Sequence, residues 1–475
     1  MDNTTFYKRN LDSVFFKKIV LSILFIVIFS FITFSAIKSG NYLFLTAALS
    51  LPIIMSLMTR LDIAYVIMTI LAATMIYIDK GNYLLVSTIL MAYMILFLVL
   101  SICINSDIKK LYNNEYGSKY LIIFFIFTII IMLVRGTGIR ILGSPMWGGT
   151  AYILLLLSIL FYVLVIPRII LSRGQIKFLI IASLIFSIVG AVFKLTSSTS
   201  VVEVYLARAN WLTPVIFAML PIIFASLTKR RKVLPILFFL ICIILIMLTG
   251  YRSRLVMLAA VAFGFGYFKT NNKSSYLFKT LLITIVGWII AIIIAPVVPD
   301  AMQRTLSFIP GVSINYQVAL NAQDSNSWRI EIWSYAISEI KNYWLVGRGV
   351  AFNVQDAVDR LGITVGQGNT YQAFLTHTYH SGPITLLVDF GIPGLITALG
   401  FMIFVFKKVS KIATQFSKID LFEEQYFLFL CVSLMWSIFS FWFVFGDPRS
   451  LSKLLLLTAH VMIISNSLKK IYKIK

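Results

Sequence analysis

Long apolar runs follow one another along almost the whole chain, separated by short polar turns. A helix needs roughly 20 apolar residues to cross the hydrocarbon core of a bilayer. The pattern predicts fourteen membrane-spanning helices, near residues 18–36, 41–58, 63–78, 83–105, 120–134, 149–167, 178–193, 211–228, 233–249, 255–268, 280–297, 382–406, 426–445 and 451–468. We therefore expect an all-α, polytopic transmembrane bundle of about 12–14 helices.

The composition is unlike that of an ordinary soluble domain. Hydrophobic residues make up 60% of the 475 residues and charged residues only 12%, about half the share typical of soluble proteins. The three cysteines lie inside apolar runs and are interpreted as small buried hydrophobic residues. The first apolar run lacks a small-residue cleavage site, so we expect it to remain as a helix.

The net charge of +23 is distributed unequally over the predicted turns. If the amino terminus is placed in the cytoplasm, 26 of the 41 Lys and Arg residues fall in cytoplasmic segments. This is the positive-inside pattern, which predicts that both termini are cytoplasmic. The basic residues would then contact anionic lipid, so the charge does not indicate a nucleic-acid partner.

One connection, residues 298–380, is much longer than the others and falls on the predicted outer side. It contains an amphipathic run from Trp328 to Trp344 at helical spacing. We expect an ordered cap of short helices at the outer membrane face. The chain would divide into amino-terminal helices (1–228), a core that includes this outer loop (229–406) and carboxy-terminal helices (407–475).

Two arginines, Arg252 and Arg254, bracket a sharp turn at the predicted outer end of the ninth span. A guanidinium fork suits a phosphate or diphosphate, because it offers paired donors to two oxygens. The alternative is that both side chains cap helix ends and reach toward lipid headgroups.

The outer loop carries a second arginine cluster beside tryptophans. Arg329 and Trp333 lie four residues apart, on one face of the predicted helix, and Trp328 and Glu331 flank them. A tryptophan ring can stack on a sugar while the arginine holds its phosphate. Alternatively, the tryptophans only anchor the helix in the membrane interface.

Two of the three histidines, His377 and His380, lie at the end of this loop. A histidine is the side chain best suited to accept a proton near neutral pH. The two could instead bind a metal, but no third ligand is evident, and no carboxylate cluster has metal-ligand spacing. We therefore predict no metal and no cofactor. His460, inside an apolar run, is interpreted as a buried structural histidine.

The residues from His380 onward resemble the motif of the O-antigen ligase and polymerase superfamily of bacterial surface-polysaccharide enzymes. That motif is a histidine, then Asn, Ser or Gln, nine residues, Gly, two residues, and Gly, Thr or Tyr. Here it is His380 and Ser381, nine residues, Gly391, two residues, and Gly394. Every fixed position fits.

Two further stretches resemble the same family. The turn at 249–252 is similar to its Thr-x-Ser-Arg turn, with Tyr251 in place of the serine. An Arg-then-Trp helix leading to a Gly-x-Gly also occurs, as Arg329, Trp333 and residues 347–349. Together the motifs cover roughly residues 230 to 400 in the family's order.

The resemblance implies a fold like that of GT-C membrane glycosyltransferases, in a bacterial plasma membrane with the active site outside. It implies that His380 is the base that deprotonates an acceptor sugar hydroxyl. Arg252 and Arg329 would bind the diphosphate of a polyprenyl-diphosphate-linked oligosaccharide, with Arg254 and Arg348 as second-rank candidates. A chain-length regulator protein would be a further partner.

Other assignments are also implied around these residues. Trp328 and Trp333 would stack on sugar, whereas Glu331 and Asp389 would pair with an arginine or orient His380. The acceptor would be another glycan, lipid-linked or not. Polymerisation of repeat units is favoured over ligation of finished polysaccharide to lipid A-core or protein.

Two unrelated classes are less compatible with the chain. A flippase or other transporter would show short loops, two related halves and charges in mid-span, whereas no internal repeat is visible here. A dolichyl-type mannosyltransferase would need acidic residues in a sizeable first outer loop, which this sequence lacks.

Overall fold

Every regular element in the described part of the chain is a helix. The computed structural model describes residues 60–74, 86–105, 116–137, 149–196, 219–220, 223, 233–351, 373–419 and 421–473. The predicted spans 18–36 and 41–58, and most of 211–228, lie outside these residues.

Six of the described helices are long and apolar enough to cross a membrane: α5 (Ser118–Arg135), α6 with the 3-10 turn η3 (Thr150–Arg168), α12 (Lys273–Ile294), α17 (Gly382–Phe416), α18 (Phe422–Phe443) and α19 (Pro448–Tyr472). The other helices are α3 (Leu61–Thr74), α4 (Val86–Asn105), α7 (Arg173–Thr196), α10 (Val233–Leu248), α11 (Arg252–Lys269), α13 (Asp300–Leu306) and α14 (Tyr316–Tyr343), and a second 3-10 turn, η4 (Ala295–Val297), follows α12. The all-α polytopic class predicted from the apolar runs is confirmed.

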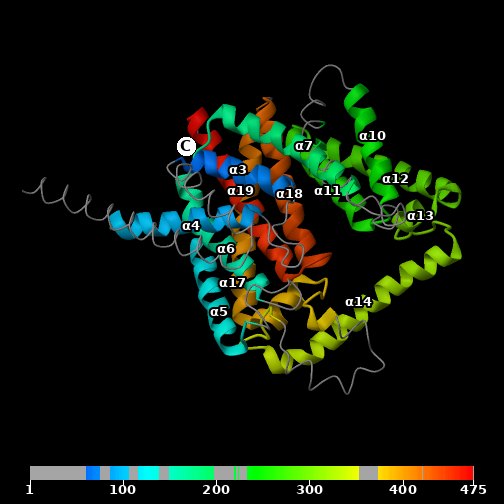
Figure 1. The fold of residues 1–475 in the computed structure, drawn as a ribbon. Coiled ribbons are helices and arrows are strands. Elements are labelled where there is room, and N and C mark those ends of the chain that lie inside the picture. The colour runs from blue at the N-terminus through cyan, green and yellow to red at the C-terminus, as the bar shows by residue number, and fades with distance from the viewer. Residues whose placement is uncertain are drawn as a thin grey trace, which may run out of the picture.

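The centre of the protein is a bundle of α5, α6, α17, α18 and α19, which we call the central bundle (Figure 1). Within it α19 packs on α6 and α18, and α17 packs on α5 and α18. Of the apolar stretch of α19, 72% is buried. The helices of the central bundle are apolar on most sides and therefore pack against one another.

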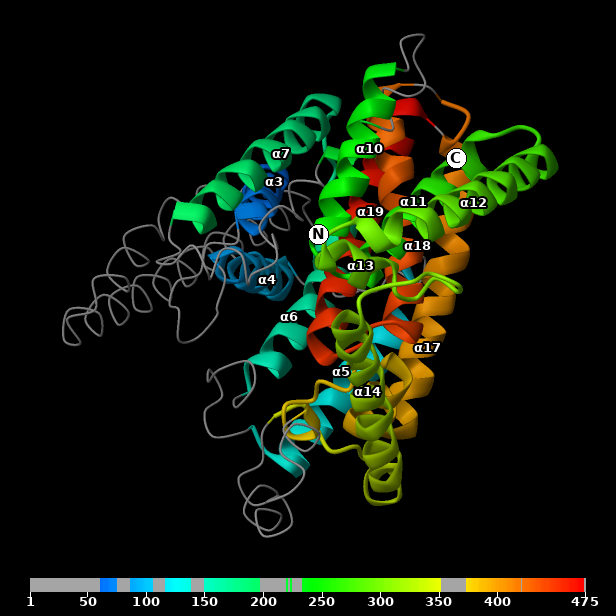
Figure 2. The same ribbon diagram turned by 90° about the vertical axis from the view of Figure 1, so that its right-hand side faces the viewer.

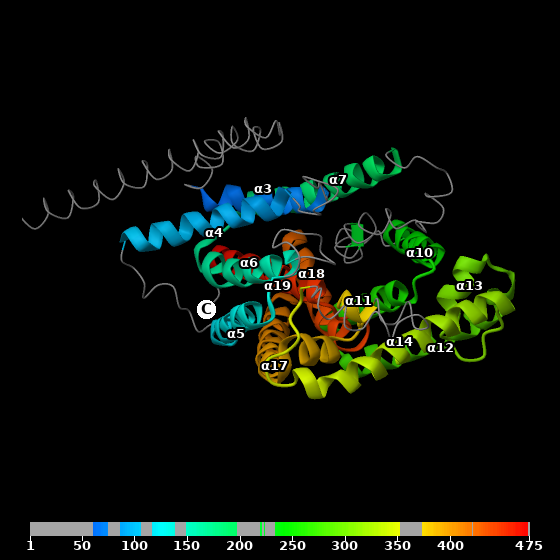
Figure 3. The ribbon, with the colours of Figure 1, turned by 60° about the horizontal axis from the view of Figure 1, so that its bottom comes forward.

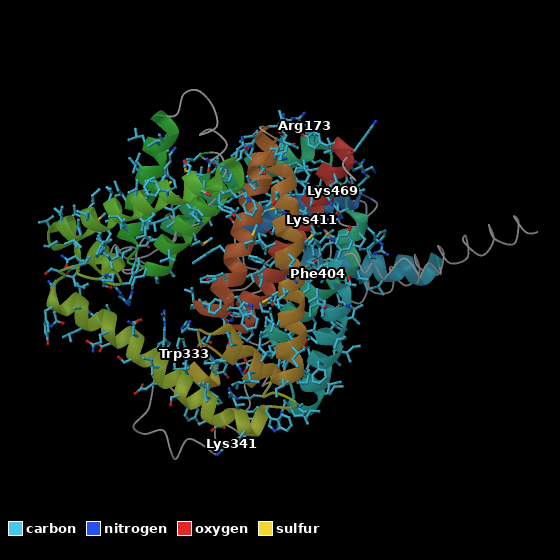
Figure 4. The ribbon with its side chains drawn as sticks, turned by 180° about the vertical axis from the view of Figure 1, so that it is seen from behind. Arg173, Trp333, Lys341, Phe404, Lys411 and Lys469 are labelled. Atoms are coloured by element: carbon cyan, nitrogen blue, oxygen red, sulfur yellow. The ribbon has the colours of Figure 1, made fainter. Side chains whose placement is uncertain are left out.

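The two ends of the central bundle carry different side chains (Figure 4). Arg173, Lys411 and Lys469 gather at one end, whereas Trp333 and Lys341 lie at the opposite end. The first three are residues that the positive-inside pattern assigns to the cytoplasm. At that end Arg173 on α7 is paired with the buried Glu423 at the start of α18, with a nitrogen-to-oxygen distance of 2.9 Å.

Helices α10 to α14, which we call the peripheral group, lie on the opposite side of the central bundle from α3 and α4 (Figure 3). Only 11% of the apolar stretch of α12 is buried, so this helix presents most of its surface to its surroundings. A small separate core, built around Met247, Ala291, Ala295 and Leu306, holds α10, α12 and α13 together.

Helix α14 corrects one expectation about the long loop. The loop was expected to fold into short helices, but α14 has 28 residues and contains the whole amphipathic run up to Tyr343. No glycine or proline interrupts residues 316–343, so the helix continues unbroken. It begins next to α13, and its far end meets α17 at the bottom of Figure 2. The long loop therefore joins the peripheral group to the central bundle.

Candidate functional site

A second hydrophobic core seats α14 on the segment that carries the histidines. Ile332, Ala336 and Tyr343 project from one face of α14 at helical spacing and pack with Phe374 and Tyr379. Trp333 adds a direct bond, because its Nε1 donates to the backbone oxygen of Tyr379 at 2.7 Å. This tryptophan, predicted to stack on a sugar, thus positions the histidine segment in the structure.

His380 lies at the end of this segment, just before α17, and has an unusual backbone conformation. Its φ of 55° lies in the left-handed region, which residues other than glycine rarely adopt. The ring is half-buried between Trp328 and Phe445, with ring centroids 5.4 and 4.2 Å away. No described residue makes a hydrogen bond with the ring, so it can accept one from a substrate.

Arg252 on α11 and Arg329 on α14 act on each other electrostatically, and Arg329 also acts on His380. Arg252, which precedes the predicted span 255–268, donates from its Nη2 to the backbone oxygen of Ala322 at 3.1 Å. The Nε of Arg329 is buried without a hydrogen-bond partner. Neither guanidinium has a carboxylate partner among the described residues. Two half-buried like charges in this arrangement favour an anion between them.

Arg329 interacts electrostatically with both Arg252 and His380. Burial lowers the pKa of Arg252, and the charge of Arg329 lowers it further. Burial likewise lowers the pKa of His380, again assisted by Arg329, while the carboxylate of Asp447 opposes the shift. The imidazole is therefore neutral near pH 7, the form in which it can accept a proton.

A buried cluster of polar side chains lies next to this site in the chain. The Nδ1 of His377 is 2.9 Å from Oδ1 of Asp389, and the Tyr379 hydroxyl donates to the same oxygen at 3.0 Å. Arg348 contacts the Tyr379 hydroxyl at 3.4 Å and donates to the backbone oxygen of Phe374 at 2.6 Å. All four polar side chains are at most 5% exposed. Asp389 therefore lies against His377, not against His380.

The motif glycines allow a backbone-to-backbone contact between α17 and the Gly-x-Gly turn. Gly391 interrupts α17 with a φ of 68°, and Arg348 N–H donates to the freed carbonyl of Val388 at 2.7 Å. A Cβ on Gly391 would stand 2.7 Å from the backbone oxygen of Leu345, and one on Gly347 would stand 2.4 Å from that of Asp389. Gly394 has no room for a side chain either, because Phe390 fills the space. The spacing of the motif thus fixes the position of Arg348.

The remaining predicted residues lie at the edge of this arrangement. The Arg254 guanidinium stacks on the ring of Tyr251, 4.2 Å from its centroid. The Glu331 side chain is exposed on α14. Within the described residues no group of three or more His, Cys, Asp or Glu side chains could hold a metal ion.

A cavity of about 250 Å³ lies next to Phe445, between α11, α18 and α19. Its walls include Trp436, Phe441 and Phe445, together with Lys453 and the serines at 437, 440 and 450. Phe445 lines this cavity and also packs against the ring of His380.

Four contributors to the site were not predicted as such: the His377–Asp389 pair, Tyr379, Phe445 and Asp447. One signal was present in the sequence, because Asp389 is a carboxylate inside an apolar span and such a charge requires a partner. The partner precedes the helix by five residues, so helical spacing does not reveal it. Phe445 and Asp447 come from a turn between two spans, and only the fold brings them to His380.

Comparison with protein-family models supports the resemblance derived from the motifs. Residues 236–399 match the model of the O-Antigen ligase family. This stretch runs from α10 through α14 to α17, and it contains Arg252, Arg329, Arg348 and both site histidines. No curated protein sequence matches the chain. The chain is therefore a polytopic membrane protein in which residues 236–399 are similar to the O-antigen ligase family.

Proposed function

We propose that the protein is a glycosyltransferase that moves a glycan from a polyprenyl diphosphate to an acceptor sugar hydroxyl at the outer face of a bacterial plasma membrane. One observation carries this proposal. Among the described residues, the half-buried Arg252 and Arg329 have no carboxylate partner, and Arg329 acts on His380, whose buried ring Nδ1 makes no hydrogen bond. The family match over residues 236–399 supports the same reaction class.

In the proposed step the acceptor hydroxyl oxygen attacks the anomeric carbon of the donor sugar. The new glycosidic bond forms as the bond from that carbon to the diphosphate oxygen breaks, and the diphosphate leaves with both electrons. His380 accepts the hydroxyl proton. Arg252 and Arg329 stabilise the negative charge that develops on the leaving diphosphate.

The surroundings of His380 suit the two substrates. The polyprenyl tail of the donor would lie in the membrane beside the exposed apolar surface of the peripheral group. The acceptor sugar would approach from the cavity next to Phe445, whose aromatic walls and hydroxyl groups match the faces and edges of a pyranose. Trp328, 5.4 Å from His380, would contact the sugar being transferred.

Two acceptors fit this reaction. We propose that the acceptor is a lipid-linked repeat unit, which makes the protein a polymerase of O-antigen, capsule or exopolysaccharide. The alternative is a ligase that joins finished polysaccharide to lipid A-core or to protein. A chain-length regulator is a partner only in the first case.

The phenotype of His380→Ala tests the function and separates the two acceptors. The variant replaces the native gene, and the surface polysaccharide is displayed on a gel. A single repeat unit on the acceptor identifies a lost polymerase, whereas long, unattached lipid-linked polymer identifies a lost ligase. A normal ladder of attached polymer contradicts the proposed role of His380.

We further propose that the transfer needs no metal ion, because arginines can neutralise a leaving diphosphate. Transfer by purified protein should be unchanged by EDTA. Loss of activity with EDTA and its recovery with added Mg²⁺ or Mn²⁺ would contradict this point without affecting the role of His380.

A further inference from the structure

His377 lies only three residues before His380, yet its environment is entirely different. The two histidines share one turn and both have left-handed backbone, with φ of 58° and 55°. Apart from glycines, the only other described residue with positive φ is Lys473. A residue with a side chain keeps this conformation only where its surroundings enforce it, and such positions concentrate at functional sites.

Contacts of the His377 side chain hold its backbone in this left-handed conformation. It is 3% exposed, and its Nδ1 lies 2.9 Å from Oδ1 of Asp389, which is fully buried on α17. The backbone of the Gly-x-Gly turn closes over Asp389, because Gly349 N–H donates to its carbonyl at 2.9 Å. The turn that carries both histidines is thereby attached to the central bundle.

The charges around the pair are balanced within the cluster. Tyr379 donates its hydroxyl to the Asp389 carboxylate and is contacted in turn by the guanidinium of Arg348. A buried carboxylate therefore has two hydrogen bonds and a nearby cation, an arrangement that avoids the cost of an isolated buried charge.

We infer that His377 is a positioning residue, which together with Asp389 holds the 376–381 turn so that the His380 ring faces Arg329. The inference rests on the proposed function. It extends that function by assigning the two neighbouring histidines different tasks: His380 touches the substrate, and His377 fixes where His380 stands.

The small space beside His377 favours a positioning role over direct contact with a sugar. The cavity that His377 lines, together with Thr376 and Arg449, is only about 10 Å³. This volume holds one water molecule at most and cannot admit a sugar. His377 therefore acts on the reaction only through the turn that it holds.

Two substitutions of His377 distinguish positioning from chemistry. Asparagine tolerates left-handed backbone and can donate its side-chain amide to Asp389, whereas alanine can do neither. We expect His377→Ala to lower the maximal transfer rate about 100-fold, the effect of a small misplacement of a reacting group. The half-saturating amount of donor should change little, and His377→Asn should restore most of the rate.

The assay uses purified full-length protein and the lipid-linked oligosaccharide extracted from a host strain that lacks the gene. His460→Asn is the matched control, because His460 also has a side-chain hydrogen bond, to the hydroxyl of Tyr65, but lies on α19 away from this turn. It should transfer at the wild-type rate. An inactive wild-type protein would overturn the proposed function itself. An active wild type and an inactive His380→Ala, together with a fully active His377→Ala, would overturn only the positioning role.

Two other results also overturn the positioning role. In one, His377→Asn is folded but as inactive as His377→Ala, which would mean that the ring itself does chemistry. In the other, Tyr379→Phe, which removes one hydroxyl from the same carboxylate, and Asp389→Asn both transfer at the wild-type rate. If His377→Ala does not fold, the variants Tyr379→Phe and Asp389→Asn test the positioning role in its place.

A spectroscopic measurement tests the same inference without activity. The chain has only three histidines, so selective ¹⁵N labelling gives three sets of ring signals that His377→Asn and His460→Asn assign. Asp389→Asn should change the signals of both His377 and His380 and leave those of His460 unchanged. A His380 signal that stays at its wild-type position would contradict the coupling of the two histidines through the turn.

Discussion

The central bundle and the peripheral group contribute different parts of the site and differ in how firmly they hold them. His377, Asp389 and the turn of His380 belong to the central bundle or to the segment packed on it, and the polar cluster there is fully enclosed. Arg252 and Arg329 belong to the peripheral group, whose helix α12 buries only 11% of its apolar stretch. The turn of the proposed proton acceptor is thus fixed by an enclosed polar cluster, whereas the proposed anion-binding arginines have no carboxylate partner among the described residues.

This difference matches the demands of the proposed reaction. A general base must stand within hydrogen-bond reach of one hydroxyl, so a small displacement is costly. A diphosphate is large and multiply charged, and two long arginine side chains can follow it over a short distance. We infer that the central bundle sets the geometry of the reaction and that the peripheral group binds the donor.

The largest expected effect comes from the peripheral arginines. Arg329→Ala should lower the transfer rate about 100-fold to 1,000-fold, the range for loss of one charge-stabilising donor. Arg329→Lys should recover only part of it, because an ammonium cannot form the paired bonds of a guanidinium. Arg254→Ala is the matched control, since its guanidinium stacks on Tyr251, and it should stay within a few-fold of wild type. Equal losses for Arg254 and Arg329 would remove the distinction between them.

The second effect concerns stability and compares one glycine from each region. Gly391→Ala places a side chain on left-handed backbone and 2.7 Å from the Leu345 carbonyl, and should cost at least about 1–3 kcal/mol of unfolding free energy. Gly287→Ala on α12 meets nothing within 4 Å and should be neutral or stabilising by up to about 1 kcal/mol. Thermal unfolding in detergent measures both. Similar melting temperatures for the two variants would contradict the contrast in packing.

The third effect concerns the contact between the peripheral group and the histidine segment packed on the central bundle. Trp333→Phe removes the bond from Nε1 to the Tyr379 carbonyl and should cost about 1 kcal/mol, the net value of one hydrogen bond. The transfer rate should fall a few-fold. If Trp333 instead stacks on the sugar, phenylalanine would raise the half-saturating amount of substrate without changing the melting temperature.

The smallest effect is a pair of opposite shifts in the pH profile. His380 must be neutral to act as a base, so the rate rises with pH through its pKa, which lies below the ordinary value of 6.5. Arg329→Gln removes a lowering influence and should move this acid limb to higher pH. Asp447→Asn removes a raising influence, keeps the helix cap, and should move the limb to lower pH. Shifts in the same direction would contradict the assignment of the limb to His380.

The sequence predicted the helices because each apolar run is itself the reason that a helix forms in a membrane. Arg252, Arg329 and His380 could also be predicted, since each occurs in a motif that resembles the family. The difference between the two regions could not. It depends on Asp389 meeting His377 across the start of α17 and on Gly391 breaking that helix, and both are contacts between segments that the fold alone brings together.

Arg348 illustrates the same limit. As the middle residue of the Gly-x-Gly turn it was a second-rank candidate for the diphosphate. In the structure it is 5% exposed and lies over the ring of Phe374, with its Cζ 4.1 Å from the ring centroid. We now propose that it balances the charge of Asp389.

The proposed separation of donor binding by the arginines from proton acceptance by His380 is tested most directly by measuring binding and transfer separately on the same variants. Purified wild type, Arg252→Ala, Arg329→Ala and His380→Ala are titrated with polyprenyl diphosphate, and transfer is then assayed with the host's lipid-linked oligosaccharide. We predict that both arginine variants bind the diphosphate more weakly, whereas His380→Ala binds it as wild type does and transfers no sugar. Loss of binding in His380→Ala equal to that in the arginine variants, or unchanged binding in both arginine variants, would contradict the account.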